Sequence, residues 1–460
     1  MQLARTLIGH MTALGTDIPE RILRQVRLHT ADAIAIGYAG ARLPEGRPAR
    51  KLLAACQAGG TRGASMVIGA TQALPPALAA GVNAASMHVL DFDDIHDVAR
   101  LHPTSVCLPA ALAAGQVADV DDVTLVRAIA LGVELMCRLG EAIRPTGSGH
   151  AAGWFLTQLL GYLGASLSAG IALGLTEDEL VSSLGLAYMQ AAGGKEAANG
   201  IGTDARGIYP AFAAMGGVQA ALMAQAGVAG PETALDGRAG LFPLYLGAPL
   251  GATATERVLR RGAWAFSATE VKRWPSCRLS QPYIAAACTL RPRIADLANI
   301  RDIKVSINAS AAKLCEPLDQ RRRPLTLHDA KYSIPFMVAF ALTHEEVGLH
   351  TLTESCLGDP AILSLTDRIS LDPSLPDNPG HPPARIAVRT VDGTRIVSES
   401  VTSLALSEEA LYAKFAGCLA LAGLAGEIDA AWSAITDVQA QTSVLGTLAR
   451  LQTATGAAAA

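Results

Sequence analysis

Charged residues are scarce in this chain. They make up 17% of its 460 residues, whereas hydrophobic residues make up 50%; in a typical soluble domain about a quarter of the residues are charged. A chain of this length and apolar content can build a large core and about two domains. So few charges predict that part of the surface is hidden, either by a membrane or by a partner subunit.

A membrane span is not the expected explanation. Residues 151–175 and 211–229 are uncharged over nearly a membrane-spanning length, but both are interrupted by glycine and polar residues. Neither has the lysine-rich or arginine-rich flank that marks a cytoplasmic end. We therefore expect helices rich in small residues, buried in a bundle or in a dimer interface, and no membrane partner.

Cysteine pairs with metal-ligand spacing are also missing. The eight cysteines include no Cys-x-x-Cys pair and no close group with histidine, which argues against zinc and against a disulfide framework. The first residues lack the long apolar segment of a secretory signal. The net charge is −4 and no basic stripe is present, so nucleic acid is not an expected partner. We expect a reducing, cytoplasmic location.

The pattern of apolar residues divides the chain into blocks. Residues 18–246 have helical spacing, with Gly40 as a plausible stop of the first long helix and Thr176–Glu179 as a capping box. Strand-like alternation follows about residue 265, at 300–310 and in a hairpin at 385–401 that turns at Asp392-Gly393.

Residues 408–451 have helical spacing again. If this return packs on the first block, residues 1–265 and 405–460 form one discontinuous helical domain, and residues 266–404 form a smaller α/β domain. The predicted fold is therefore mainly α with an α+β second domain.

The titratable residues gather in one stretch, LDFDDIHDVARLHPTS (90–105), which holds four aspartates, two histidines and an arginine. If residues 83–94 end a helix, His88, Asp91 and Asp94 follow one another at three-residue spacing on one face. Aspartates at a helix C-terminus meet an unfavourable dipole, which raises their pKa values unless a cation answers them.

His102 stands immediately before Pro103, which suits the first turn of a new helix. The positive end of that helix favours a neutral imidazole, which can take up a proton at physiological pH. Two other interpretations stay open. The stretch could be a solvated acidic loop with His102 as a cap, or a metal site built from His88, Asp91, Asp94 and His102. We expect no metal.

Several segments resemble the MmgE/PrpD family. NAASMHVLDFDDIH followed by HPTSVCLPAALAAG resembles its signature, and EVKRWPSCRLSQPYIAAA resembles its Lys-x-x-Pro-x-Cys stretch. The likeness covers most of the chain in the same order. It implies a large helical domain built from both ends of the chain, a smaller α/β lid between them, a homodimer, and no cofactor. It also implies removal of a proton beside a carboxylate, followed by loss of water or carbon dioxide or by reprotonation.

The resemblance implies a set of site residues. His102 matches the histidine of the family's His-Pro pair, Asp91 the first aspartate of its Asp-x-Asp-Asp motif, and Lys272 a lysine that binds a carboxylate or transfers a proton. Substrate-binding candidates are Arg206, Asp94, His88 and Gln281.

The sequence departs from the family pattern at several of these positions. Arg206 stands for a lysine, Gln281 and Phe155 stand for histidines, and Ile95 stands for a polar residue. A lid tyrosine has no clear equivalent near Leu318. His150 could replace the missing histidine in space, and the basic loop at 320–325 could attract an anion. Arg206 can clamp a carboxylate, but it cannot act as a base at pH 7.

The predicted function is a lyase of dehydratase or decarboxylase type that acts on a small di- or tricarboxylic acid. The acid is expected to bind between the helical domain and the lid, whose closure excludes water. A cofactor-independent epimerase of an iminodisuccinate-like dicarboxylate and a non-catalytic dimeric relative are the alternatives.

Overall fold

The computed structural model describes residues 2–143, 153–199, 203–376, 383–400, 405–437 and 443–459. Two compact units form within it. Unit 1 consists of Met1–Asn199, Asp204–Val271 and Ser407–Ala460, and unit 2 consists of Gly200–Thr203 and Lys272–Leu406. Helices predominate and the only large sheet of the described residues lies in unit 2, which confirms the predicted fold class.

Unit 1 is a helical bundle with one short strand pair. Its helices are α1 (Leu3–Leu14), α2 (Glu20–Arg42), α3 (Arg47–Gln57), α4 (Pro76–His88), α5 (Thr104–Ala118), α6 (Asp122–Ile143), α7 (Leu156–Ala172), α8 (Glu177–Tyr188), α9 (Glu196–Asn199), α10 (Ala205–Gln225), α11 (Leu241–Leu246), α12 (Ala252–Val258), α19 (Glu408–Leu421), α20 (Ile428–Thr436) and α21 (Val444–Ala459). Strand β1 (Ile95–His96) pairs with β2 (Thr269–Glu270).

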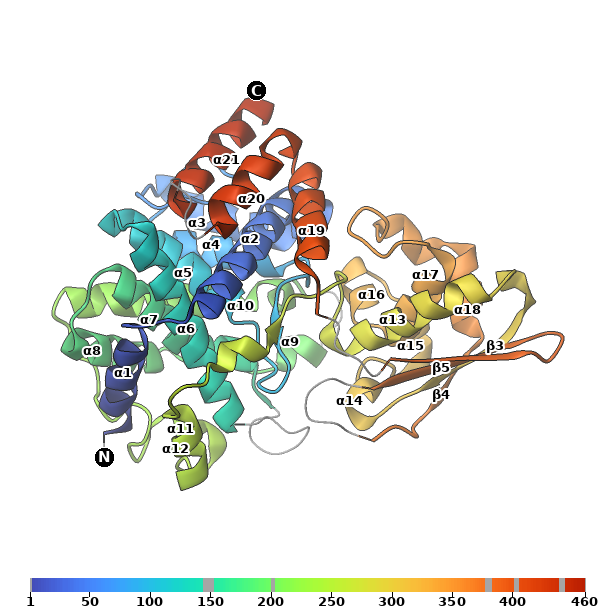
Figure 1. Cartoon of the computed structure of the whole chain (residues 1–460), viewed down its shortest axis with the longest axis horizontal. Coiled ribbons are helices and arrows are strands. Elements are labelled where there is room, and N and C mark those ends of the chain that lie inside the picture. Colours follow the sequence, from blue (N-terminus) through green and yellow to red (C-terminus); the bar gives the residue numbers. More distant parts are fainter. Residues whose placement is uncertain are drawn as a thin grey trace. The chain divides into compact units, whose positions relative to one another are not determined.

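The centre of unit 1 is formed by α4, α5, α7 and α10, which pack on one another, with α6 against α7. The C-terminal helices α19 and α20 pack on α2, so the last segment of the chain lies beside one of the first (Figure 1). The capping box predicted at Thr176 and Glu179 is present at the start of α8 and is confirmed.

Gly40 does not end its helix, as the sequence had suggested, because α2 continues to Arg42. It marks instead a close approach of α2 to α4. A Cβ atom at Gly40 would lie 2.1 Å from the backbone oxygen of Ser86 and 3.1 Å from Cγ1 of Val89. Glycine is needed here so that the two helices can touch.

We therefore expect Gly40→Ala to destabilise the protein by about 1–3 kcal/mol, the usual cost of forcing extra volume into a packed core. Gly417→Ala is the matched control, because Gly417 is an exposed residue of α19 whose Cβ would meet nothing within 4 Å. This control should gain about 0.5–1 kcal/mol through helix propensity. Thermal unfolding of both variants checks the prediction, and equal melting temperatures would contradict it.

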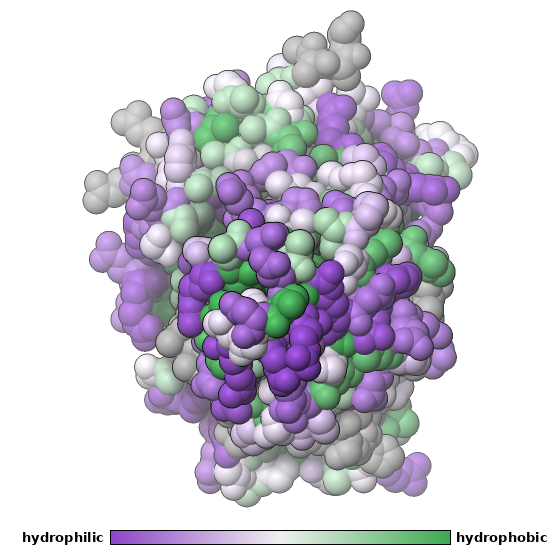
Figure 2. Space-filling model, turned by 90° about the vertical axis from the view of Figure 1, so that its right-hand side faces the viewer, coloured by the Kyte–Doolittle hydropathy of each residue, from purple (hydrophilic) through white to green (hydrophobic). Residues whose placement is uncertain are grey.

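Among the described helices, α10 is long and apolar enough to cross a membrane by length and composition, but 67% of its most apolar window is buried inside the structure. A buried core helix meets the same criterion, and α7, from the other apolar stretch, is also mostly buried. Figure 2 shows one face of the molecule, where hydrophilic side chains predominate near the viewer and hydrophobic ones form small patches between them.

Unit 2 combines short helices with a four-stranded sheet. Its helices are α13 (Gln281–Leu290), α14 (Ala309–Ala312), α15 (Leu318–Arg322), α16 (Leu327–Lys331), α17 (Ile334–Thr343) and α18 (Pro360–Asp367). Its strands are β3 (Ile300–Ser306), β4 (Ile369–Asp372), β5 (Ala384–Thr390) and β6 (Arg395–Ser400), in the order β4-β3-β5-β6. Helix α13 packs on β5 and β6, and α17 packs on α13 and α18 (Figure 1).

The predicted hairpin is confirmed, since β5 and β6 are antiparallel and Gly393 in their turn has a positive φ of 89°. Arginines of the basic segment 320–325 bind other groups of unit 2. Arg321 donates hydrogen bonds to the backbone oxygens of Glu316 and Lys313, and Arg323 pairs with Asp367 at 2.8 Å.

Candidate active site

The aspartate-rich stretch is a turn and not the end of a helix. Helix α4 stops at His88, where the sequence pattern had predicted that it continues to Asp94. Asp91 has a positive φ of 54°, and its N–H donates to the carbonyl of His88 at 2.8 Å. Aspartate tolerates this left-handed conformation better than most residues. The turn therefore buries Asp91, Asp93 and Asp94 close together instead of spacing them along one helix face.

His88 is paired with Asp93, a residue that the sequence analysis did not single out. Nδ1 of His88 lies 2.8 Å from Oδ2 of Asp93, and both side chains are almost fully buried. An ionised carboxylate can only accept, so Nδ1 carries the hydrogen and Nε2 of the neutral ring holds the lone pair. The ring of His88 also contacts the ring of His102 edge-on, with centroids 5.1 Å apart.

His102 lies where the sequence predicts it, just before α5. Its Nδ1 is 2.6 Å from the backbone oxygen of Asp94 and 3.5 Å from Oδ2 of Asp93. A carbonyl oxygen can only accept, so Nδ1 must donate, and Nε2 of the neutral ring is then the basic nitrogen. The backbone N–H of His102 donates to Oγ1 of Thr157 at 3.0 Å, which fixes the residue from the side of α7.

Asp94 fixes the turn with its side chain as well as with its carbonyl. Its carboxylate accepts hydrogen bonds from Nδ1 of His29 at 2.8 Å and from Oγ1 of Thr104 at 2.5 Å. His29 comes from α2, 65 residues earlier, and sequence reasoning gave it no role. The substrate-binding role expected of Asp94 stays a prediction, and these contacts show that its carboxylate is held by protein groups.

An aromatic wall adjoins the two histidines. Tyr209 of α10 contacts the ring of His88 edge-on at 4.8 Å, and Phe155 stacks on Tyr209 at 4.4 Å. Burial raises the pKa of Tyr209 far above its usual value, Asp93 and Asp91 add to the rise, and Thr157 and Arg206 oppose it. Tyr209 is therefore a neutral hydroxyl at physiological pH.

Two residues that the sequence analysis named, Arg206 and Phe155, lie close to Tyr209. Arg206 is half-buried in the first turn of α10, within electrostatic reach of Tyr209. Phe155, at the position where the resemblance leads one to expect a histidine, gives this side of the site an aromatic surface. His150, which might have replaced that histidine, lies outside the described residues.

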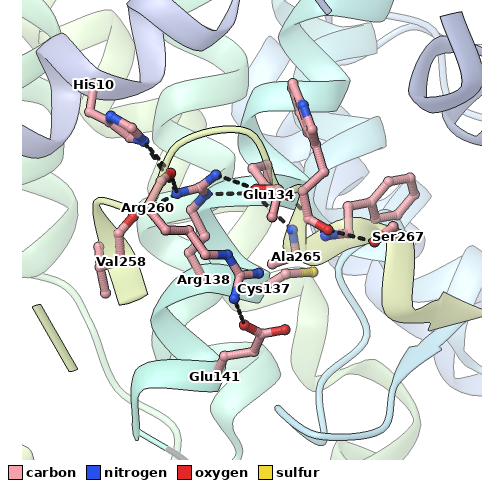
Figure 3. Close-up of polar contacts among 12 residues, drawn as sticks. His10, Glu134, Cys137, Arg138, Glu141, Val258, Arg260, Ala265 and Ser267 are labelled. Atoms are coloured by element: carbon pink, nitrogen blue, oxygen red, sulfur yellow. Dashed lines mark hydrogen bonds and ion pairs between the residues drawn. The ribbon is translucent and has the colours of Figure 1, made fainter. Parts of the chain in front are cut away.

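A buried ion pair holds the segment that leads to β2 (Figure 3). Arg138 and Glu134 of α6 have side chains that are 0% exposed and lie 2.5 Å apart. Glu134 accepts from the backbone N–H groups of Ala265 and Phe266 at 2.9 and 2.8 Å. Arg138 donates to the backbone oxygens of Val258, Arg260 and Ala263, and to Nε2 of His10.

This segment connects the turn to the predicted lysine. Ile95, next to Asp94, pairs with Glu270, and Lys272 follows two residues later. Chain connectivity alone keeps the α-carbon of Lys272 within about 7 Å of that of Glu270. Lys272 is fully buried and belongs to unit 2, and its expected part in catalysis stays a prediction.

Gln281 is also fully buried in unit 2. Its amide nitrogen donates to the backbone oxygens of Trp274 and Ser276, and its amide oxygen accepts from the N–H of Trp274. These bonds shape the turn that follows Lys272. The role of Gln281 in substrate binding stays a prediction.

His88, Asp93 and His102 could also surround a cation, since one ligand atom from each lies within 4.8 Å of the others. This set differs from the one considered from the sequence, because Asp93 takes the place of Asp91 and Asp94. The contacts of Nδ1 in both rings leave Nε2 with a lone pair, which can take up a proton or bind a metal. The same hydrogen-bond pattern serves proton transfer and metal binding, so the absence of a metal remains a prediction.

Comparisons with known proteins agree with the resemblance. Cis-aconitate decarboxylase of Aspergillus terreus is 27% identical over 413 residues, covering 85% of this chain and 83% of the relative. A cis-aconitate decarboxylase-like protein of Aspergillus oryzae is 29% identical, with 83% and 82% covered. The enzyme of Homo sapiens is 26% identical, with 66% and 63% covered. Residues 11–251 match the MmgE/PrpD N-terminal domain and residues 274–431 the MmgE/PrpD C-terminal domain, so the chain belongs to the MmgE/PrpD family.

Proposed function

We propose that the chain is a lyase of decarboxylase or dehydratase type that acts on a small di- or tricarboxylic acid. The observation that carries this proposal is the hydrogen bond from Nδ1 of His102 to the carbonyl of Asp94, which leaves Nε2 as a proton acceptor. The cis-aconitate decarboxylases among the relatives support a lyase rather than an epimerase.

The proton steps follow from the position of His102. In a dehydration, Nε2 takes the proton from the carbon beside a carboxylate, the electron pair forms the new double bond, and hydroxide leaves as water with the proton that the imidazolium returns. In a decarboxylation, Nε2 first takes up a proton from solvent. The carbon–carbon bond to the leaving carboxylate then breaks, its electron pair delocalises into the remaining conjugated acid, and Nε2 delivers the proton to carbon. The His88–Asp93 pair supplies a second imidazole at 5.1 Å for either direction of transfer.

Recognition of the acid requires positive charge. Arg206 supplies a permanent cation on α10, and Lys272 remains the predicted second group. The wall formed by Phe155 and Tyr209 consists of two stacked, uncharged rings, of which Tyr209 is buried and Phe155 is half-buried. We infer that the preferred acid bears an unsaturated or alkyl-substituted carbon that packs on this wall, with its carboxylates turned toward the cations.

Incubation of the protein in heavy water with a panel of acids tests the proposal. The panel contains cis-aconitate, citrate, 2-alkylcitrates and itaconate, and NMR follows each carbon. A decarboxylase yields a product that has lost carbon dioxide and carries one deuterium at the carbon that His102 protonates, whereas a dehydratase yields an unsaturated product that has lost water. Deuterium uptake with inversion and no bond loss would indicate the epimerase instead. No exchange on any acid would contradict both and support a non-catalytic relative.

We also propose a homodimer formed through unit 1. Phe212 of α10 and Met189 after α8 are large apolar side chains that are 44% and 69% exposed in the single chain, as expected where a second subunit covers the surface. Light scattering of the purified chain tests this, since a monomer would contradict it.

A further inference from the structure

A buried ion pair lies directly behind the aspartate turn. Lys414 of α19 places Nζ 2.9 Å from Oδ1 of Asp32 on α2, and the two side chains are 5% and 2% exposed. The same Nζ donates to the backbone oxygen of Phe92 at 2.8 Å and lies 3.8 Å from the centre of the Phe92 ring. Phe92 lies between Asp91 and Asp93, so Lys414 binds the middle residue of the turn.

The contact of Lys414 with Phe92 fixes the neighbouring residues Asp93 and Asp94, which orient His88 and His102. The carbonyl of Phe92 belongs to the same peptide unit as the nitrogen of Asp93, whose carboxylate orients His88. One residue further on, the carbonyl of Asp94 orients His102. The side chain of Asp94 is itself tied to His29, one helical turn before Asp32 on α2. Helix α2 thus secures the turn at two points, through His29 and through the Asp32–Lys414 pair.

Stability alone does not account for such a pair. Desolvation of two buried charges costs so much that well-packed apolar residues of similar volume are often equally stable or better. What the pair does provide is a fixed charge and a directed hydrogen bond, and these are the means by which an outer residue orients an inner one.

We propose that Lys414 and Asp32 are positioning residues, which hold the Asp91–Asp94 turn so that the basic nitrogens of His88 and His102 face the substrate. The proposal rests on the function proposed above for His102, and it adds a C-terminal helix to the machinery of the site.

The pair has a pH limit. Burial raises the pKa of Asp32 to about 6, Lys414 and His29 oppose the rise, and Asp94 adds to it. The neighbouring thiol of Cys418 on α19 stays protonated because burial raises its pKa to about 12. Below pH 6 Asp32 takes up a proton and its attraction for Lys414 is lost. The turn is then expected to loosen, which makes the acidic limb of the activity near pH 6 steeper than an imidazole base alone would give.

The test uses the full-length double variant Lys414→Met/Asp32→Asn, which removes both charges and so leaves neither one buried alone. We expect it to fold, to lose kcat about tenfold to hundredfold through misplacement of the histidines, to keep KM within a few-fold, and to have a less steep acidic limb than the wild type. The matched control is Arg27→Met/Asp122→Asn. It removes another ion pair of α2, at 2.6 Å, which does not contact the turn, and its kcat and pH profile should stay unchanged.

An activity-independent readout separates this proposal from the proposed function. Histidine labelled with ¹⁵N gives imidazole signals for His88 and His102, which single-histidine variants assign. If the wild type converts no acid, the proposed function fails. A shift of these signals in the double variant still supports the positioning role of Lys414 and Asp32. Wild-type signals in a folded double variant would overturn the positioning role of Lys414 and Asp32. Where the wild type is active, an unchanged kcat and pH profile would overturn it as well.

Discussion

Replacing His102 with asparagine is expected to lower the rate of deuterium exchange and of product formation about 10²- to 10⁴-fold, the usual cost of removing a positioned base. The amide nitrogen of asparagine can take the place of Nδ1 and donate to the carbonyl of Asp94, as the imidazole does at 2.6 Å. The backbone oxygen of Asp94 therefore keeps its hydrogen bond. What disappears is Nε2, because an amide has no basic nitrogen at pH 7.

The substitution His350→Asn serves as the control. His350 is half-exposed in unit 2 and faces Glu346 at 3.3 Å, so its loss should change neither the melting temperature nor kcat. Exchange in the His102 variant within tenfold of wild type, with an unchanged fold, would show that another group carries the proton. Steady-state kinetics and NMR exchange on one substrate measure both variants.

The sequence was sufficient wherever local chemistry decides the structure. The capping box at Thr176, the turn at Asp392-Gly393 and the start of α5 after His102 are set by residues within four positions of one another. Helical spacing likewise located most helices. In each case the signal and the structure that it specifies occupy the same short segment, so no knowledge of the tertiary fold is required.

The aspartate turn could not be predicted in the same way. Helical spacing favoured continuation of α4 through Asp94. The residues that bind the turn in its non-helical conformation come from distant segments of the chain. His29 lies 65 residues before Asp94, and Lys414 lies 322 residues after Phe92. Pairing across such separations leaves no periodic signal in a single sequence. For this reason Asp93, His29 and Lys414 escaped notice, whereas the position of His102 just before α5 was predicted.

The prediction with the largest effect on stability concerns the pair in Figure 3. We expect Glu134→Gln to destabilise the protein by about 3–5 kcal/mol, because it leaves the fully buried guanidinium of Arg138 without its counter-charge. The amide NH₂ group would also face donors. Glu134 accepts from Arg138 and from the N–H groups of Ala265 and Phe266, and a glutamine has one oxygen with which to accept.

Glu427→Gln is the matched control, since it makes the same chemical change in a pair with Arg450 whose side chains are 28% and 38% exposed. Such a pair is worth at most about 1 kcal/mol, and urea unfolding monitored by circular dichroism should separate the two variants clearly. A loss at Glu134 no larger than at Glu427 would mean that the pair is not desolvated as described. A large loss would also explain why the charges are kept: Glu134 and Arg138 together bind five backbone groups of residues 258–266, and that segment leads into β2, the strand that pairs with the turn beside Asp94.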